Sequence, residues 1–380
     1  MCLSAFDAAP MKTLAVTQSI DPVKGGGLGM AVCDLHRAMA HVCDEDTTVI
    51  GIDGDHLQSD DKFCVRSFPG VGPAGAYYNP RLGAAVAEET AKADIVHLHG
   101  FYTYPMLHGW RAAKRHGKPV VRHAHGILEP WILQRSRLKK AIAHFVFEDD
   151  AFKGTALWRA LTTAEADQIR KNGGKGEIVV VPTGIDLDPI DAAPAKKAER
   201  KTLIFLSRLH KKKGLDLLLP AWQRIQPRFP EWKLAIGGKE EDGTGQWAAD
   251  YVKTNSLSDS VDVIGPIPQG GKFEFIKSGS AFILPSYSEG FSMGILEAMA
   301  CELPVICTDA CHFPEAATQG GGWECAVSID SVADALVALM SCSDSELAER
   351  GRCARRLAEE GYTWQKLAKD LHHACGASIS

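Results

Sequence analysis

The sequence lacks the features that would indicate a nucleic-acid-binding, membrane-spanning or disulfide-stabilised protein. Its 380 residues carry a formal net charge of −5, so no overall basic field favours nucleic acid. No segment approaches the roughly 18–20 consecutive apolar residues that span a bilayer, and the first residues lack the charged and apolar regions of a signal peptide. Because the 11 cysteines include no C-x-x-C pair, we expect free thiols and a cytoplasmic location.

Two short motifs of nucleotide-dependent enzymes are also missing or uninformative. The glycine-rich segment 25–29 follows the first predicted strand, but it lacks the G-x-G-x-x-G spacing of a dinucleotide-binding dehydrogenase. Asp53-Gly54-Asp55 has the D-x-D pattern of metal-dependent glycosyltransferases, yet a triplet this short arises readily by chance. Neither motif supports a function on its own.

Strand-like and helix-like patterns alternate along the first half of the chain. We expect strands near residues 13–17, 47–52, 95–99, 119–123, 160–163 and 178–181. Helical patterns begin near Met30 and also occupy about 82–92 and 106–116. This alternation predicts a parallel sheet with helices on both faces.

The alternation stops at a linker rich in alanine, proline, lysine and glutamate, and then restarts. Further strands are expected near residues 203–206, 233–236, 261–264, 281–284 and 305–306. The restart predicts an α/β protein with two Rossmann-like doubly wound domains, 1–184 and 185–360, facing across a cleft. A terminal helix in 361–380 is expected to cross back to the first domain.

A basic loop follows the first strand of the second domain. It contains Arg208 and Lys213 and ends at Gly214, before a helical pattern. Anions bind at this end of a parallel strand, where a planar guanidinium and a flexible ammonium suit a diphosphate. A solvated basic loop would look the same, so this segment alone leaves both readings open.

A second loop and helix start in the same domain carry two acidic residues. Glu289 lies in the loop after the strand at 281–284, and Glu297 lies about one turn inside the following helix. Gly290 and Gly294 allow backbone amides to approach a ligand closely. One carboxylate is therefore available to a sugar and the other to a ribose diol.

Together these segments resemble the retaining glycosyltransferases of family 4, which have the GT-B fold. The matching elements are E-x7-E, from Glu289 to Glu297, and R-L-x-x-x-K-G, from Arg208 to Gly214. The resemblance extends over nearly the whole chain, including the pattern at 94–100 and the turn at 182–186. The implied activity is that of a hexosyltransferase.

The resemblance implies a role for each matched residue. Arg208 and Lys213 would neutralise the donor diphosphate, Glu297 would bind the donor ribose, and Glu289 would contact the transferred sugar. Backbone groups of four residues after Glu289 and one near the base complete the implied donor site: Gly290, Phe291, Ser292, Met293 and Gly265. The family is usually assigned a front-face mechanism, in which the leaving diphosphate accepts the acceptor proton and no metal is obligatory.

On the acceptor side, the resemblance points to the histidine before Gly126. His125 would lie near the transferred sugar and complete the catalytic set with Arg208, Lys213 and Glu289. The acceptor side also includes His99 and a glycine loop, formed by Gly25, Gly26 and Gly27.

Four histidines form two pairs with i, i+2 spacing, His97 with His99 and His123 with His125, and each pair shares one face of a strand. Such pairs suggest zinc. No nearby cysteine or carboxylate completes a ligand set, and the resemblance explains His99 and His125 without a metal. We therefore expect no metal and no cofactor, the nucleotide sugar being a substrate.

The segment 126–131, Gly-Ile-Leu-Glu-Pro-Trp, resembles an element of family members that build bacterial polysaccharides, although His125 replaces their arginine. A basic amphipathic pattern follows, with cations at Arg135, Arg137, Lys139 and Lys140. Such a helix either lies on an anionic membrane surface or packs on its own domain with a solvated face.

The sequence thus predicts transfer of a sugar from a nucleotide-diphosphate donor to a glycan or polyprenyl-diphosphate-linked glycan. The implied process is exopolysaccharide or lipopolysaccharide synthesis in the cytoplasm or at the inner face of the membrane. Two alternatives are a nucleotide-sugar epimerase of the same fold and a non-enzymatic nucleotide-binding module. Release of free nucleoside diphosphate distinguishes the transferase from the epimerase, and both complete donor motifs together with His125 argue against the binding module.

Overall fold

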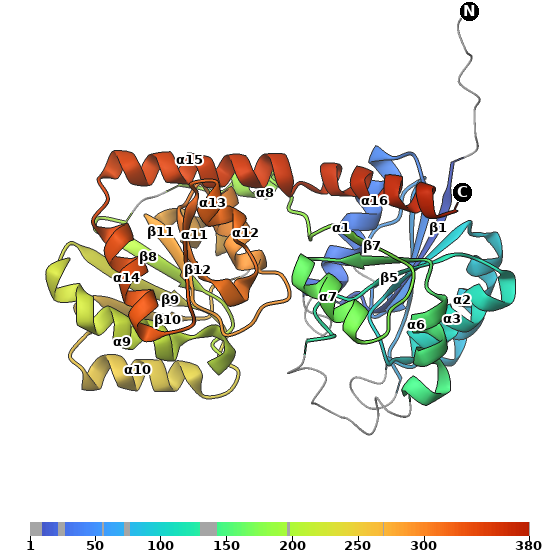
Figure 1. Cartoon of the computed structure of the whole chain (residues 1–380), viewed down its shortest axis with the longest axis horizontal. Helices are drawn as coiled ribbons and strands as arrows, with labels where there is room; N and C mark the ends of the chain where they lie inside the picture. The colour runs from blue at the N-terminus through green and yellow to red at the C-terminus, as the bar shows by residue number, and fades with distance from the viewer. Residues whose placement is uncertain are drawn as a thin grey trace, which may run out of the picture. The chain divides into compact units, whose positions relative to one another are not determined.

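The computed structural model describes most of the chain in seven segments: residues 10–21, 27–54, 57–71, 77–129, 143–195, 198–268 and 270–379. Its contacts divide the chain into two compact units (Figure 1). Unit one comprises Met1–Gly184 with Trp364–Ser380, and unit two comprises Ile185–Thr363. The first boundary lies after residue 184, as in the predicted domains, whereas the second lies three residues beyond the predicted position at 360.

Unit one is built on a sheet of seven parallel strands in the order β3-β2-β1-β4-β5-β6-β7. Its strands are β1 (Lys12–Ser19), β2 (Asp46–Ile52), β3 (Phe63–Phe68), β4 (Ile95–His99), β5 (Val120–His123), β6 (Leu157–Ala160) and β7 (Glu177–Val180). Its helices are α1 (Gly27–Val42), α2 (Pro80–Lys92), α3 (Tyr104–His116), the π-helix η1 (His144–Glu148), α6 (Asp149–Gly154), α7 (Thr163–Lys171) and α16 (Trp364–Ile379).

Helices cover both faces of this sheet because successive strand residues point to opposite sides. Leu14 and Val16 of β1 pack in a buried cluster with residues of α2 and α3. Ala15, between them, packs on the other face against α1. The carboxyl ends of the strands therefore meet at one edge, where β4 leads to Gly100 and β5 to His125.

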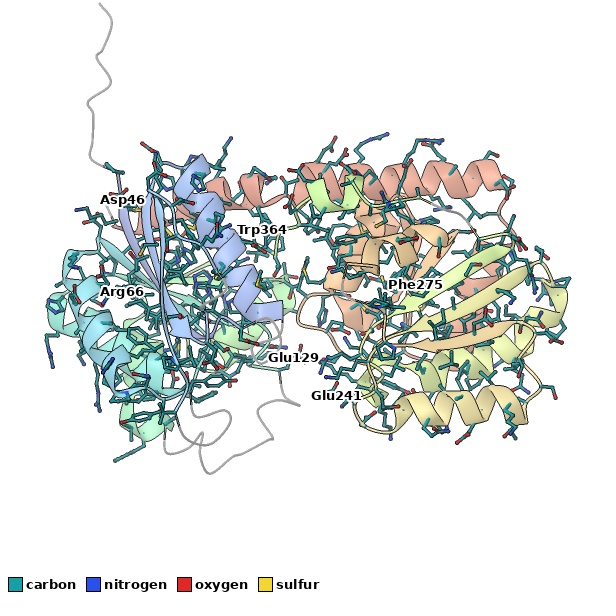
Figure 2. The ribbon with its side chains drawn as sticks, turned by 180° about the vertical axis from the view of Figure 1, so that it is seen from behind. Asp46, Arg66, Glu129, Glu241, Phe275 and Trp364 are labelled. Atoms are coloured by element: carbon teal, nitrogen blue, oxygen red, sulfur yellow. The ribbon has the colours of Figure 1, made fainter. Side chains whose placement is uncertain are left out.

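The terminal helix α16 completes the face of unit one that α1 covers (Figure 1). Trp364, labelled in Figure 2, and Leu371 are buried against Leu35 and Met39 of α1. A Cβ atom at Gly184 would lie 2.5 Å from the Trp364 ring, so glycine lets the end of unit one pass beside the indole. The last segment of the chain is thus part of the first unit's core.

Unit two repeats the design with six parallel strands in the order β10-β9-β8-β11-β12-β13. Its strands are β8 (Lys201–Leu206), β9 (Trp232–Gly237), β10 (Val261–Gly265), β11 (Ala281–Leu284), β12 (Val305–Thr308) and β13 (Gly322–Cys325). Its helices are α8 (Asp188–Asp191), η2 (Lys211–Lys213), α9 (Leu215–Ile225), η3 (Gln226–Arg228), α10 (Thr244–Thr254), α11 (Lys272–Ser278), α12 (Met293–Ala300), η4 (Asp309–Cys311), α13 (Glu315–Thr318), α14 (Ile329–Met340) and α15 (Asp344–Gly361).

The structure corrects one predicted strand and adds two that were not predicted. The segment 160–163 is not a strand, because β6 ends at Ala160 and Thr162 caps α7 by accepting a hydrogen bond from the Glu165 amide at 3.1 Å. The edge strands β3 and β13 were not predicted. Each is at one end of its sheet, and β13 follows a run of glycines that weakens a strand pattern.

Candidate active site

The basic loop at the end of β8 carries Arg208 on the surface of unit two. The Arg208 guanidinium donates two hydrogen bonds to the Glu241 carboxylate, at 2.7 and 2.8 Å. Glu241, labelled in Figure 2, lies in the loop after β9, the neighbouring strand. Both side chains of the pair are largely exposed. The cation predicted to bind a diphosphate is therefore paired with a carboxylate that no motif had indicated.

Two loops of unit two, the one after β8 and the one after β11, are in direct contact. The Tyr287 amide donates to the Lys212 carbonyl at 2.9 Å. Gly214 has a φ of 74°, and a Cβ atom there would lie only 1.9 Å from the Pro285 carbonyl oxygen. Only glycine fits this approach, which brings the R-L-x-x-x-K-G and E-x7-E elements together.

Lys213 and Glu289 form a buried ion pair across these two loops. The Lys213 ammonium donates to Glu289 Oε1 at 2.5 Å, and each side chain is about 11% exposed. The Ser286 hydroxyl donates to the same oxygen at 2.6 Å. The ion pair and the hydrogen bond both fall on Oε1 and fix the orientation of the carboxylate at low solvent exposure.

Helix α12 begins directly after these residues. The Ser292 hydroxyl caps it by accepting from the Ile295 amide at 3.4 Å. A Cβ atom at Gly294 would meet neighbouring atoms at ordinary contact distances, so the protein itself does not demand glycine there. The amides of the first turn form the positive end of the helix dipole, which favours an anion.

Glu297 lies one turn inside α12 and is paired with a second lysine, Lys272, which was not predicted from the sequence. The Lys272 ammonium, at the start of α11, donates to Glu297 Oε1 at 2.6 Å. The Glu297 side chain is about 15% exposed and Lys272 about 44%. The acid predicted to bind a ribose diol is thereby fixed in position from a neighbouring helix.

Two other predicted donor residues, Phe291 and Gly265, lie in the core of unit two and at the end of a strand. The Phe291 ring packs against Phe313 and Tyr362, so its side chain belongs to the core of unit two. Gly265 ends β10 with a φ of 80°, a backbone conformation that favours glycine. Its carbonyl accepts from the Gly238 amide at 2.7 Å, after the adjacent strand β9.

In unit one, His125 follows β5 in the left-handed region, with a φ of 52°. This conformation is rare for a residue other than glycine and is often found where function requires it. The Glu165 carboxylate supports the turn by accepting from the Gly126 amide and, at 2.6 Å, from the Leu161 amide. Burial, and next the charge of Arg159, lower the pKa of His125 to about 3, so the imidazole is neutral near pH 7.

His99 lies beneath His125 instead of at the surface. It is fully buried, and its ring nitrogens contact His36 Nε2 at 2.9 Å and His125 Nε2 at 3.0 Å. In this structure His99 positions His125 and presents no free nitrogen to an acceptor. Gly27 is the first residue of α1, whereas Gly25 and Gly26 lie outside the described residues.

The basic segment with Arg135, Arg137, Lys139 and Lys140 also lies outside the described residues. Directly after it, Phe145 is about 93% exposed and Val146 about 48%. Among the helices that the structure describes, none is both long and apolar enough to span a membrane. Every cysteine that the structure describes is free, in agreement with the expected thiols.

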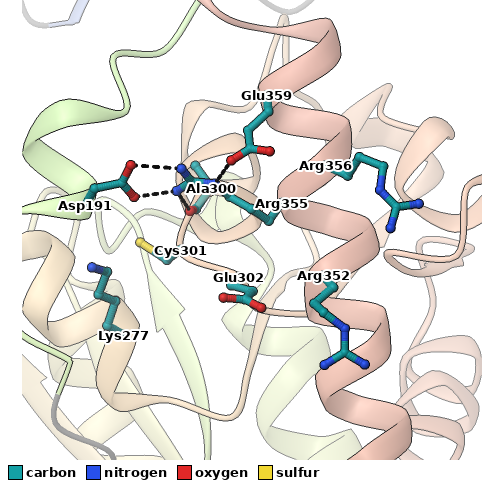
Figure 3. Close-up of a pocket in the computed structure, with 9 residues that line it drawn as sticks. All are labelled: Asp191, Lys277, Ala300, Cys301, Glu302, Arg352, Arg355, Arg356 and Glu359. Carbon is teal, nitrogen blue, oxygen red and sulfur yellow. Dashed lines mark hydrogen bonds and ion pairs between the residues drawn. The ribbon is translucent and has the colours of Figure 1, made fainter.

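A separate pocket of unit two contains several cations but none of the predicted donor residues (Figure 3). Arg355 donates to both carboxylate oxygens of Asp191, at 2.8 and 2.9 Å, and to Glu359 at 2.6 Å. Three acids among its lining residues oppose its four cations, and the pocket holds neither of the two motifs that indicate a donor site.

Comparison with protein families gives two adjacent matches. The model of "Glycosyl transferases group 1" matches residues 188–357, and that of "Glycosyltransferase Family 4" matches residues 25–189. The two matches together follow the division into units. The E-x7-E and R-L-x-x-x-K-G elements both fall within the first match.

Among curated proteins, the chain is similar to a GDP-mannose:cellobiosyl-diphosphopolyprenol alpha-mannosyltransferase of Xanthomonas campestris. The two are 26% identical over 324 residues, which cover 82% of each chain. It is also similar to a D-inositol 3-phosphate glycosyltransferase of Kribbella flavida, at 27% identity over 310 residues, covering 76% of this chain and 72% of that protein.

Solved structures share the fold along nearly the whole chain. Anabaena HepE in complex with UDP superimposes with a TM-score of 0.76 at 18% identity, covering 97% of this chain and all of that one. Sucrose-phosphate synthase from Thermosynechococcus elongatus gives a TM-score of 0.73 at 17% identity, covering 97% and 98%. At these identities the likeness establishes the architecture of two Rossmann-like units.

Proposed function

Since the chain belongs to the GT-B-fold glycosyltransferases of family 4, we propose that it transfers a sugar, with retention of configuration, from a nucleotide-diphosphate sugar to a glycan or polyprenyl-diphosphate-linked glycan. The observation that carries the donor assignment is the contact between the loops after β8 and β11. It brings Arg208, Lys213, Glu289 and the start of α12 into one part of unit two.

The charges of this site suit a diphosphate once the donor displaces Glu241. Without a donor, Arg208 pairs with Glu241 and Lys213 pairs with Glu289, so the four side chains sum to zero. When Arg208 leaves Glu241 for the diphosphate, its guanidinium and the amides of α12 face the ligand as donors. The charge that develops on the leaving diphosphate is then stabilised electrostatically.

In the front-face mechanism that we propose, the leaving diphosphate oxygen accepts the proton of the acceptor hydroxyl. Glu289 would accept hydrogen bonds from hydroxyls of the transferred sugar, and Glu297 would bind the ribose diol. Because His125 is neutral near pH 7, its part in the reaction is to form a hydrogen bond and not to act as an acid. The proposed chemistry requires no metal.

The proposed physiological role is the synthesis of a cell-surface polysaccharide in the cytoplasm or at the inner face of the membrane. The similarity to an enzyme named for a diphosphopolyprenol acceptor supports a lipid-linked glycan. The two exposed apolar residues Phe145 and Val146 support contact with a membrane surface beside the basic segment.

The proposal is tested by incubating the full chain with a panel of nucleotide sugars and measuring thermal stabilisation and release of nucleoside diphosphate. We expect one donor to stabilise the protein and be turned over, and Glu297→Ala to lose both effects. Glu274→Ala, which removes an exposed acid on the neighbouring helix α11, serves as the matched control. Stabilisation by none of the donors, or a Glu297→Ala variant that behaves like the wild type, would refute the assignment.

A further inference from the structure

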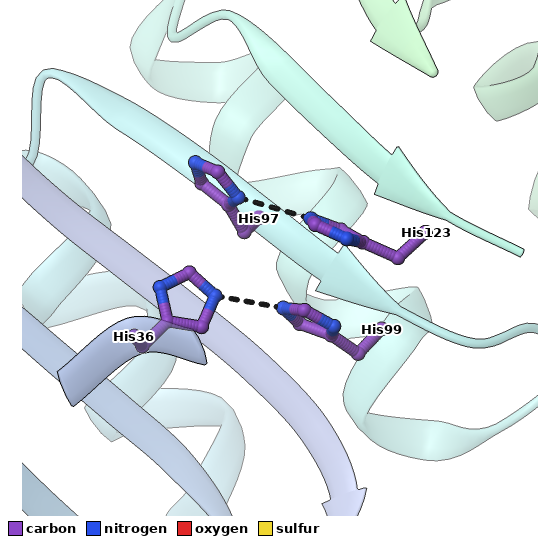
Figure 4. Close-up of side chains that lie close together, drawn as sticks. All are labelled: His36, His97, His99 and His123. Atoms are coloured by element: carbon purple, nitrogen blue, oxygen red, sulfur yellow. Dashed lines mark hydrogen bonds between the residues drawn. The ribbon is translucent and has the colours of Figure 1, made fainter. Parts of the chain in front are cut away.

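Unit one contains a cluster of four buried histidines (Figure 4). His36 comes from α1, His97 and His99 from β4, and His123 from β5, and none is more than 1% exposed. One ring nitrogen from each lies within 4.8 Å of those of the other three. These nitrogens therefore lie close together, drawn from the sheet and from α1.

The backbone fixes three of these rings on one face of the sheet. β4 and β5 are neighbouring parallel strands in which His99 is in register with His123, and their ring centroids are 3.8 Å apart. The i, i+2 spacing places His97 beside them. His36 meets the rings of His97 and His99 nearly edge-on, at interplanar angles of 89° and 84°. The cluster therefore draws its rings from two neighbouring strands and from the helix that packs over them.

The nitrogen separations are close to those of a metal site. His36 Nε2 lies 2.9 Å from His99 Nε2, and His97 Nδ1 lies 3.0 Å from His123 Nε2. Four nitrogens at about 2.0–2.1 Å from a tetrahedral ion are roughly 3.3 Å apart. Starting from a largest separation of 4.8 Å, movements of less than about 1 Å per nitrogen reach this geometry.

The second nitrogens of two rings also have polar neighbours. His99 Nδ1 lies 3.0 Å from His125 Nε2, and His97 Nε2 lies 3.9 Å from the Cys375 thiol. A metal-bound imidazole carries its proton on the other nitrogen and donates it outward, so both contacts become donor bonds in the bound state. Metal binding would therefore place the His99 proton on Nδ1, and this N–H would donate to His125 Nε2.

The surroundings also restrict which ion fits. The guanidinium of Arg159 lies 3.5 Å from His123 Nδ1, while its Nε–H donates to the Val181 carbonyl at 2.8 Å. Its charge opposes a cation at the cluster, and its N–H meets the nitrogen that carries the proton in a metal-bound His123, so metal binding must break this one contact. Calcium and magnesium require oxygen ligands, whereas imidazole binds zinc and other borderline transition metals strongly.

We propose that His36, His97, His99 and His123 form a structural site for one divalent transition-metal ion of the zinc class. Four protein ligands leave no open position, as in structural zinc sites. The ion would join β4, β5 and α1 in the core of unit one. The proposal is independent of the donor chemistry of unit two.

Zinc content and stability test the site directly. The full chain, without a polyhistidine tag, is refolded from denaturant in zinc or in chelator, desalted and analysed for metal. We expect about one zinc per chain and a melting temperature higher by roughly 5 °C or more in the zinc sample. Cobalt(II) in place of zinc should give the visible absorption of a tetrahedral complex, a result that needs no variant.

His36→Gln separates metal binding from hydrogen bonding, because the glutamine amide still forms hydrogen bonds but is a poor zinc ligand. We expect this variant to bind at least fivefold less zinc per chain than the wild type and to show no stabilisation by zinc. His116→Gln, at the exposed end of α3, is the control and should retain both. The proposal is overturned if the refolded wild-type protein retains no zinc and gives no tetrahedral cobalt spectrum, or if His36→Gln keeps its full zinc content. In either case the four histidines form a hydrogen-bonded imidazole network and not a metal site.

Discussion

The pairing of Arg208 with Glu241 predicts that removing the Glu241 charge tightens donor binding. Both side chains are largely exposed, about 64% and 42%, and an exposed ion pair is worth roughly 0.2–1 kcal/mol. A donor that recruits Arg208 must first break this pair. Glu241→Gln removes the competing carboxylate, so the Kd of the donor or its nucleoside diphosphate should fall by about 1.5- to 5-fold.

Titration calorimetry at low and high salt measures this effect. The gain should shrink at about 0.5 M salt, because exposed charges are screened there. Asp262→Asn is the matched control, since it removes an exposed carboxylate paired with Lys233 at 3.4 Å in the same unit, and it should leave the Kd unchanged. Weaker donor binding by Glu241→Gln would refute the reasoning and show that Glu241 holds Arg208 ready for the donor.

Two further predictions concern stability. Lys213→Met leaves the buried Glu289 carboxylate without its cation and should lower the free energy of unfolding by roughly 3 kcal/mol in a urea titration, whereas Lys213→Met with Glu289→Gln should recover part of the loss. The hydrogen bond to Glu45 raises the pKa of His372 above 6.5. The protonated pair therefore stabilises the fold fully below pH 6.5, and this stabilisation is lost as the pH rises through the raised pKa of His372. His372→Gln should therefore cost roughly 0.5–1 kcal/mol at about pH 5.5 and less at about pH 8.5, while His373→Gln, on the exposed side of α16, changes neither.

Much of the fold was predictable because buried parallel strands are short apolar runs of regular spacing. The strands at 95–99 and 281–284 were predicted at their observed bounds. Thr162 was misread because threonine favours strands and also caps helices, and only the following helix decides between these roles.

Site residues that belong to one sequence motif were predictable. Their ion-pair partners were not, because folding brings those partners in from other parts of the chain. Arg208 and Glu297 were found from their spacing, but their partners Glu241 and Lys272 lie 33 and 25 residues away on neighbouring elements. One signal did exist, since the acidic run at 240–242 follows a predicted strand beside the basic loop.

The histidine cluster shows the same limit of sequence reasoning. The pairs on β4 and β5 were visible as i, i+2 patterns, yet no further ligand was apparent nearby. His36 joins them from α1, a helix about 60 residues earlier in the chain, and only the packing of that helix on the sheet brings it there.

The central claim, that Arg208 and its neighbours bind a nucleotide-sugar diphosphate for transfer, is tested most directly by the turnover of Arg208→Ala with the preferred donor. Because Arg208 is exposed, its loss should leave the melting temperature unchanged and lower kcat/KM by roughly 100- to 1,000-fold. Arg224→Ala, which removes an exposed arginine paired with Asp330 in the same unit, should retain wild-type turnover. An Arg208→Ala enzyme as active as the wild type would contradict the account.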